Sequence, residues 1–191
     1  MRKIISQEKV EKKRRRNQLI IGGILILVMA LSTIGYSLSG SNKSSSTSLK
    51  YNGFEFTKTS GLWNTNAGSF QFSFQYNPNE AEKTNSVLNP LSSYQGKPLY
   101  IYTENSEAGT EIYRNLFYQN QIVQRVQEAC LEADKCAENA PAKTCDDNFI
   151  VIRKSSNIGI SQNKSCVFIE GKSEDLIKLS DSFLYKITGI Q

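Results

Sequence analysis

The 191-residue sequence contains no histidine, and this absence excludes more chemistry than any other feature of the composition. Histidine is the commonest general base near neutral pH, so Ser-His-Asp and Cys-His catalysis and histidine-based zinc sites are ruled out. The sequence also lacks a G-x-S-x-G motif, a phosphate-binding loop and a dinucleotide-binding glycine pattern. We therefore expect no catalytic residues, no metal and no cofactor, and we favour a protein without enzymatic activity. A Ser-Lys pair stays open as a hydrolytic alternative, because both residue types are abundant.

Acidic residues are scarce at the N-terminus, where residues 1–17 contain eight Lys and Arg but only Glu8 and Glu11, a charge of +6. The remaining 15 basic and 16 acidic residues give residues 18–191 a charge of −1. Binding to nucleic acid needs a basic face on the folded domain, so we expect no nucleic-acid partner.

Charge is absent from residues 19–38, which read LIIGGILILVMALSTIGYSL. Twenty uncharged, mostly apolar residues match the thickness of a bilayer when they form a helix. This run predicts a transmembrane helix at 18–38, with the lipid bilayer as a partner. The positive flank predicts a basic cytosolic tail at 1–17 and places the C-terminal part outside the cell membrane. A cleaved signal peptide is the alternative, because Ser37 and Ser39 resemble a small-x-small site.

Residues 39–48 are rich in serine and predict a tether, and residues 49–191 have the length of one extracytoplasmic domain. The N-x-S patterns at Asn42 and Asn163 are possible glycosylation acceptors.

Alternating apolar residues and turn signals predict the elements of this domain. We expect hairpins at 49–59, around Asn52-Gly53, and at 61–76, followed by a strand at 98–103. Helical spacing of apolar residues predicts a long helix at 107–134 and a final helix from Ser173 to Gly189. Between them, 149–153, 158–161 and 166–170 predict a meander. The expected fold is α+β, one mixed sheet of about five to seven strands with two helices on one face, including a parallel pair between 98 and 153.

The four cysteines, Cys130, Cys136, Cys145 and Cys166, predict two disulfides. Zinc is disfavoured, because the spacings are not C-x2-4-C and no histidine is present. Sequence alone permits three pairings. We expect Cys130 with Cys166 and Cys136 with Cys145, because the phase of the predicted long helix points Cys130 at the sheet.

One concentrated group of polar residues follows the strand at 98–103 and begins the next helix. It consists of Glu104, Asn105, Ser106, Glu107, Thr110 and Glu111, at a position where α/β sheets often bind ligands. We treat Glu104, Ser106, Glu107, Thr110 and Glu111 as candidate ligand-site residues. The alternative is a helix cap with solvated acids.

The layout of basic stub, apolar helix, serine-rich tether and cysteine-bearing domain, with the phrases CVFIEG and DLIKLSDSFLYKI, resembles uncharacterised single-pass membrane-anchored proteins of small-genome archaea. This resemblance implies an anchor and no particular activity. The sequence as a whole predicts a membrane-tethered extracytoplasmic binding or assembly module that contacts other membrane or envelope proteins. The alternatives are a histidine-free cell-envelope hydrolase and an accessory subunit of a membrane complex.

Overall fold

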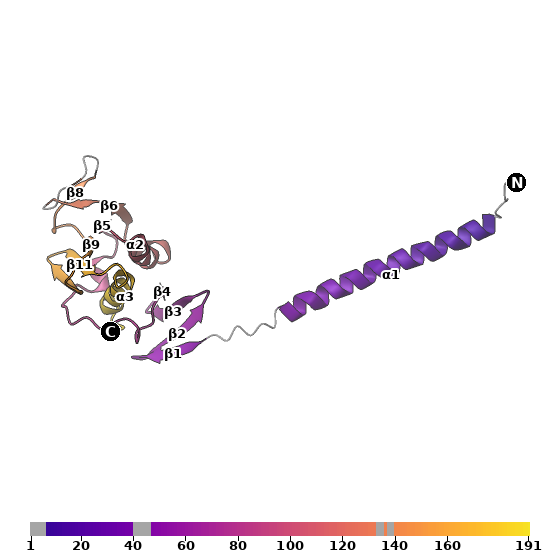
Figure 1. Cartoon of the computed structure of the whole chain (residues 1–191), viewed down its shortest axis with the longest axis horizontal. Coiled ribbons are helices and arrows are strands. Elements are labelled where there is room, and N and C mark those ends of the chain that lie inside the picture. Colours follow the sequence, from indigo (N-terminus) through magenta and orange to yellow (C-terminus); the bar gives the residue numbers. More distant parts are fainter. Residues whose placement is uncertain (1–6, 40–46, 133–135, 137–139) are drawn as a thin grey trace. The chain divides into compact units, whose positions relative to one another are not determined.

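The computed structural model divides the chain into two compact units, Met1–Ser45 and Ser46–Gln191, which we describe separately (Figure 1). It describes residues 7–39, 47–132, 136 and 140–191. The predicted tether at 39–48 lies mostly outside these residues, and the acceptor Asn42 lies wholly outside them.

The first unit contains the helix α1, Gln7–Ser39. The apolar run does not begin a helix of its own, because Arg14, Arg15 and Arg16 precede it within the same helix. Across the described residues, no helix combines the length and the apolar character that crossing a membrane requires. The predicted transmembrane helix at 18–38 is therefore wrong, and so is the single-pass placement built on it, with a cytosolic tail and an external domain.

The second unit contains two larger sheets and a small one. An antiparallel sheet has the order β1-β2-β3-β4 and a mixed sheet has the order β10-β11-β9-β5-β6, while β7 and β8 pair separately. The strands of the antiparallel sheet are β1 Ser48–Tyr51, β2 Phe54–Thr59, β3 Leu62–Ala67 and β4 Phe70–Phe74. The other strands are β5 Pro98–Thr103, β6 Arg125–Glu128, β7 Cys130–Leu131, β8 Ala142–Lys143, β9 Phe149–Lys154, β10 Gly159–Asn163 and β11 Cys166–Gly171. The helical elements are the 3-10 turn η1 Leu91–Ser93, α2 Ser106–Tyr113, the π-helical turn η2 Arg114–Tyr118, and α3 Leu176–Ile187.

The antiparallel sheet is a run of hairpins fixed by short turns. Asn52 and Gly53 have φ of 46° and 84°, the left-handed conformation that a two-residue hairpin requires. Ser60 and Gly61 repeat this geometry between β2 and β3, with φ of 53° and 87°. The predicted hairpins at 49–59 and 61–76 are confirmed by the pairing of β1 with β2 and of β3 with β4.

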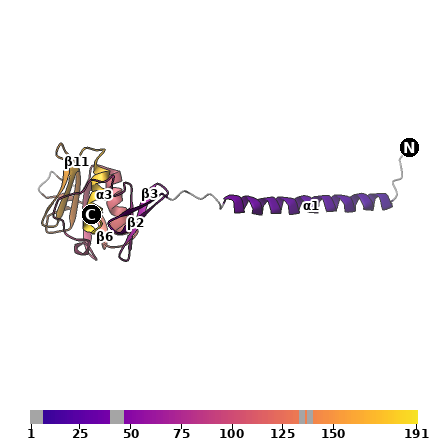
Figure 2. The same ribbon diagram turned by 90° about the horizontal axis from the view of Figure 1, so that it is seen from below.

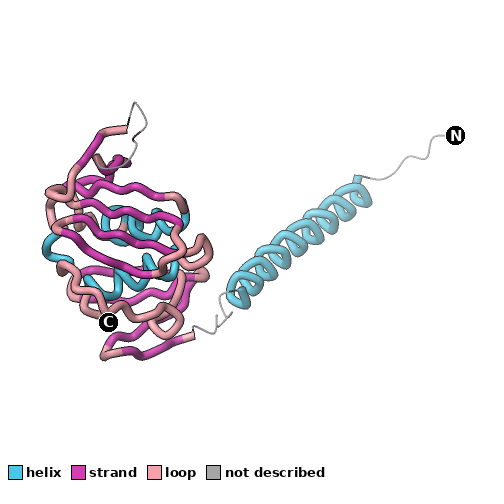
Figure 3. Tube along the Cα trace, turned by 60° about the vertical axis from the view of Figure 1, so that its left-hand side comes forward, coloured by secondary structure: helices cyan, strands magenta, loops and turns pink. Residues whose placement is uncertain are grey.

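The helix α3 lies in a middle layer between the two larger sheets (Figures 2 and 3). On one side its Tyr185 ring packs against Phe74 of β4, with ring centroids 4.1 Å apart. On the other side Leu179 meets Gly171 of β11, where an added Cβ would lie only 2.8 Å from the leucine. Ten of its twelve residues are buried, because both sides of the helix face a sheet. The expectation of one sheet with two helices on one face is therefore corrected to two sheets with helices between them.

The order of strands in the mixed sheet departs from the predicted meander. The strand β9 pairs in parallel with both β5 and β11, so the expected parallel pair is confirmed. However, β11 lies between β9 and β10, and β10 forms the edge. The apolar sequence CVFIEG suits a strand buried on both faces, whereas GISQN suits an edge.

The predicted long helix at 107–134 is wrong. Helical structure ends at Tyr118, Gln121 has a positive φ of 48°, and the chain then forms β6 and β7. Val123 and Val126 keep the helical spacing, but Val126 pairs with Leu99 in the mixed sheet, where β-branched residues pack well. The helix therefore gives way to a strand that pairs in parallel with β5.

Two disulfides are present, with a pairing that differs from the predicted one. Cys130 pairs with Cys136 and Cys145 pairs with Cys166, so the prediction of Cys130 with Cys166 and Cys136 with Cys145 is wrong. The prediction used the phase of a helix that does not extend to Cys130, which lies in β7. The bridge between Cys145 and Cys166 instead fastens the segment between β8 and β9 to β11, over a small apolar cluster around Phe149.

Candidate functional site

An open hollow of about 670 Å³ lies where the amino ends of α2 and α3 meet. Its lining is polar and acidic apart from one aromatic and one aliphatic side chain, and consists of Tyr76, Glu104, Asn105, Ser106, Glu107, Ser173, Glu174 and Ile177. This part of the described surface contains three of the predicted ligand-site residues.

Asn105 fixes the geometry of this hollow. Its Oδ1 accepts a hydrogen bond from the Ala108 N–H at 3.0 Å and so caps α2, while its Nδ2 donates to the Ser173 carbonyl at 3.0 Å. The two walls of the hollow are thereby tied together. Gly109 allows α2 to approach β5 closely, since an added Cβ would lie 3.0 Å from Cγ2 of Thr103.

The predicted ligand-site residues divide into two groups. Glu104, Ser106 and Glu107 line the hollow, where Glu104 also accepts a hydrogen bond from the Lys154 N–H at 2.8 Å. Thr110 instead donates to the Ser106 carbonyl at 2.8 Å on the exposed side of α2. Glu111 turns into the interior and is only 3% exposed. A spacing of four residues placed Glu107 and Glu111 near each other on the helix, but only the first faces the hollow.

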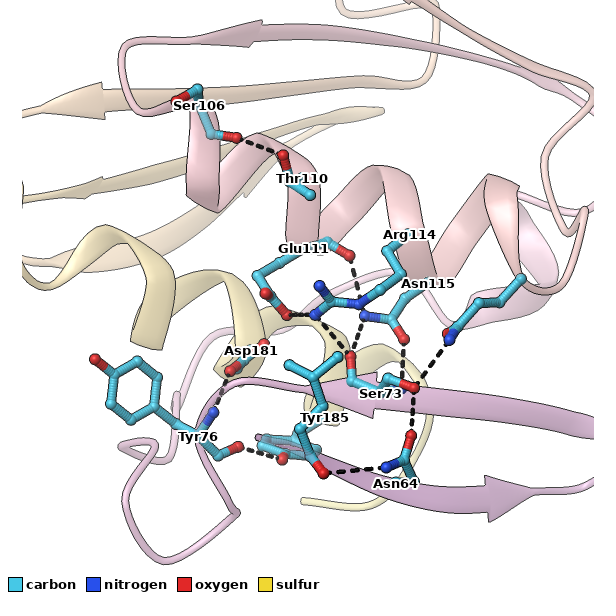
Figure 4. Close-up of polar contacts among 12 residues, drawn as sticks. Asn64, Ser73, Tyr76, Ser106, Thr110, Glu111, Arg114, Asn115, Asp181 and Tyr185 are labelled. Atoms are coloured by element: carbon cyan, nitrogen blue, oxygen red, sulfur yellow. Dashed lines mark hydrogen bonds and ion pairs between the residues drawn. The ribbon is translucent and has the colours of Figure 1, made fainter. Parts of the chain in front are cut away.

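A buried polar network surrounds Glu111 (Figure 4). Its carboxylate forms an ion pair with Arg114, and Asp181 of α3 lies nearby with no exposed surface. Burial raises the pKa of the Asp181 carboxyl well above its usual value of 3.8, and the negative charge of Glu111 raises it further. Asp181 therefore favours its neutral form in the folded protein.

The same network reaches the hollow through the backbone of Tyr76. Its N–H donates to Oδ2 of Asp181 at 2.9 Å, and its carbonyl accepts from the Tyr185 hydroxyl at 2.6 Å (Figure 4). Burial raises the pKa of that hydroxyl, so Tyr185 stays a donor. Two buried groups of α3 thus hold the segment from which the Tyr76 side chain enters the lining of the hollow.

Asparagine side chains cover the outer edge of β4. Asn115 makes two hydrogen bonds with the backbone of Ser73, and Asn120 makes two with the backbone of Gln71. Sequence reasoning missed these residues, because a spacing of five does not match the periodicity of an α-helix. Two asparagines five residues apart were the only available signal.

The remaining sequence candidates lie on the surface. Asn163 is exposed at the end of β10, and its use as a glycosylation acceptor stays a prediction. Among the described residues, no three His, Cys, Asp or Glu side chains are grouped so that they could hold a metal ion.

Comparisons of the chain with models of known protein families, with curated proteins and with solved structures find no match. The resemblance to single-pass archaeal proteins therefore stays a prediction, and the functional proposal depends on the geometry of the site.

Proposed function

We propose that residues 46–191 form a binding module that recognises a cationic group, such as a lysine or arginine side chain of a partner protein, in the hollow between the amino ends of α2 and α3. The observation that carries this proposal is the lining, which has three carboxylates and no basic side chain. Each helix N-terminus contributes about half a positive elementary charge. The two helix ends therefore offset about one of the three negative charges, and the hollow stays negative.

The form of the hollow supports the recognition of an extended or flexible partner group. It is open to solvent, so a side chain can enter without a rearrangement of the domain. The hydroxyls of Ser106 and Ser173 add polar partners beside Glu107 and Glu174. Hydrogen bonds to a charged donor are stronger than neutral ones, which favours an ammonium or guanidinium group over a neutral ligand.

A hydrolase has less support from the same residues. Asp181, which lies beside Glu111, has the most strongly raised carboxyl pKa in the described part of the chain, and a raised pKa is a common property of catalytic acids. However, both side chains are buried, and neither lines the hollow. A catalytic acid must reach its substrate, so we assign this pair a structural role.

An NMR titration of the full ¹⁵N-labelled chain with hexalysine and with hexaglutamate tests the proposal. The chain carries a net charge of +5, so attraction by overall charge would favour hexaglutamate. We expect binding of hexalysine, with the largest shift changes at the amides of Ser106, Glu107 and Glu174, weakening as salt is added.

The double variant Glu107→Gln, Glu174→Gln should bind hexalysine at least about tenfold more weakly, a loss of about 1.4 kcal/mol. The matched control is Glu55→Gln, Glu128→Gln, which removes the same charge from exposed positions in β2 and β6. Equal weakening in both double variants, or shift changes away from the hollow, would refute the proposal.

A further inference from the structure

The outer edge of β10 presents backbone groups that no neighbouring strand pairs. The Ile160 carbonyl points away from β11, because it accepts a hydrogen bond from the Ser86 hydroxyl on the outer side. In an antiparallel pair the N–H and C=O of one residue point the same way and alternate along the strand, so those of Gln162 point outward too. Residues 82–89 cover this edge with hydrogen bonds that involve a side chain on one of the two segments. For example, the Asn89 N–H donates to the side-chain Oε1 of Gln162 at 2.8 Å. Within the described residues, no backbone-to-backbone hydrogen bond joins this segment to β10.

The other outer strands of the two larger sheets each carry a feature that opposes pairing. Lys50 lies in β1, Arg125 and Glu128 lie in β6, and the amides of Asn115 and Asn120 occupy the edge of β4. In contrast, β10 reads GISQN and contains no charge. This difference marks β10 as the edge best suited to accept another strand.

Two adjoining hollows lie beside this edge. The first, of about 240 Å³, lies between residues 82–86 and β10 and has Ile158, Ile160 and Leu179 as its apolar lining. The second, of about 120 Å³, shares Ile158 and Leu179 and adds acidic side chains. Its acidic residues are Glu80, Glu82 and Asp175. An apolar side chain therefore fits the first hollow, and a basic one fits the second.

Each hollow also has one lysine in its lining, Lys83 in the first and Lys178 in the second. Nζ of Lys83 lies 5.6 Å from the ring centroid of Tyr51, and Nζ of Lys178 lies 5.1 Å from that of Tyr76. Neither Glu82 nor Asp175 forms an ion pair among the described residues. The second hollow therefore has three carboxylates against one ammonium group and stays negative.

We propose that the outer edge of β10 is a docking site for an extended segment of a partner protein, which adds to the mixed sheet as a further strand and carries an aliphatic residue followed two positions later by lysine or arginine. Side chains two positions apart share one face of a strand, about 7 Å apart, which suits two adjoining hollows. The charge complementarity selects a basic residue for the second hollow. Residues 86–89 move aside on binding and give up the contacts of Ser86 and Asn89 with β10, while residues 82–85 keep their place in the wall of the first hollow. This site is separate from the hollow of the proposed function and does not depend on it.

An end-capped octapeptide that alternates threonine and isoleucine, with one lysine two positions after an isoleucine, serves as the probe. The control peptide has glutamate in place of the lysine. Binding to the full chain is measured by fluorescence anisotropy, and hydrogen exchange is measured at the amides of Ile160 and Gln162. We expect exchange of both amides to slow at least tenfold at saturating peptide, and the glutamate peptide to bind at least fivefold more weakly.

The variant Gln162→Pro removes the outward N–H, at an edge position where proline is tolerated. Gln162→Thr loses the same side-chain contacts but keeps that N–H, so it is the matched control. We expect binding to fall at least tenfold in the proline variant and less than threefold in the threonine variant. Repeating the titration in the chain with Glu107→Gln and Glu174→Gln separates this site from the other hollow, and unchanged binding there supports the proposal. Equal binding in the two Gln162 variants, or no binding of the lysine peptide, would overturn the proposal. A concentration-dependent dimer that the proline variant abolishes would also overturn it, because the occupant would then be a second copy of the chain.

Discussion

Asn115 and Ser73 are joined by two hydrogen bonds of 2.8 Å, one from the Ser73 N–H to Oδ1 and one from Nδ2 to the Ser73 carbonyl. Asn120 bonds in the same way to Gln71, at 3.1 and 2.8 Å. Gln71 and Ser73 are alternate residues of β4, so two amide side chains replace the neighbouring strand that this edge lacks. The π-helical turn η2 makes this possible, because it places residues five apart on the same side.

Replacing Asn115 by alanine should destabilise the domain by about 2 kcal/mol, because the buried N–H of Ser73 would lose its acceptor, while Arg114 would still donate to the Ser73 carbonyl. Asn120→Ala is the matched comparison. Its bonds to Gln71 are exposed, so water can replace them, and the loss should stay near 1 kcal/mol. Urea denaturation of the full chain followed by circular dichroism measures both values. Equal losses in the two variants would contradict the role assigned to burial.

The buried carboxyl of Asp181 should make stability fall as pH rises. Its pKa in the folded chain is raised above its usual value of 3.8, so the stabilisation that it contributes is complete below pH 3.8 and is lost as pH rises through the raised pKa. Within that window the free energy of unfolding should fall by about 1.4 kcal/mol per pH unit from this group. Glu111 of α2 and Arg114 of η2 are the charged groups that act on it.

Asp181→Asn should remove this pH dependence, because an amide keeps an acceptor for the Tyr76 N–H and cannot ionise. Asp175→Asn, at the partly exposed residue just before α3, is the control and should keep the wild-type profile. The measurement is urea denaturation at a series of pH values from 4 upward. A wild-type slope that persists in Asp181→Asn would show that another group titrates.

The two disulfides should differ in their contribution to stability. The bridge between Cys145 and Cys166 closes a loop of 21 residues and that between Cys130 and Cys136 a loop of 6. Loop-closure entropy then gives about 3 kcal/mol for the first and about 2 kcal/mol for the second. Paired Cys→Ser variants, compared by urea denaturation under non-reducing conditions, measure the difference. Peptide mapping of the unreduced protein would contradict this account if it linked Cys130 to Cys166.

Local signals in the sequence predicted part of this fold well. Asn52-Gly53 predicted the first hairpin, and the apolar stripe of α3 predicted the final helix, because turn conformation and helix amphipathicity are set by neighbouring residues. The long helix failed where tertiary context decided, since Val126 pairs with Leu99 of β5 although its spacing from Val123 is helical. The disulfide pairing failed with it. The membrane span failed because the apolar run was considered apart from the arginines in the same helix.

The candidate site was predictable only in part, for the same reason. Glu104, Ser106 and Glu107 follow a recognisable strand, so their position at the start of α2 could be inferred. Ser173 and Glu174 come from the other end of the domain, and only the packing of α3 against α2 brings them to the same hollow. No pattern in the sequence connects these two segments.

Reversal of charge in the hollow tests the central claim most directly. Isothermal titration of the full chain with hexalysine and hexaglutamate should show a preference for hexalysine in the wild type. In the variant Glu107→Lys, Glu174→Lys the preference should invert, because the hollow loses two negative charges and gains two positive ones beside two positive helix ends. Circular dichroism establishes that the variant is folded. If the folded variant binds hexalysine within twofold of the wild-type affinity, the hollow is not the site of cation recognition.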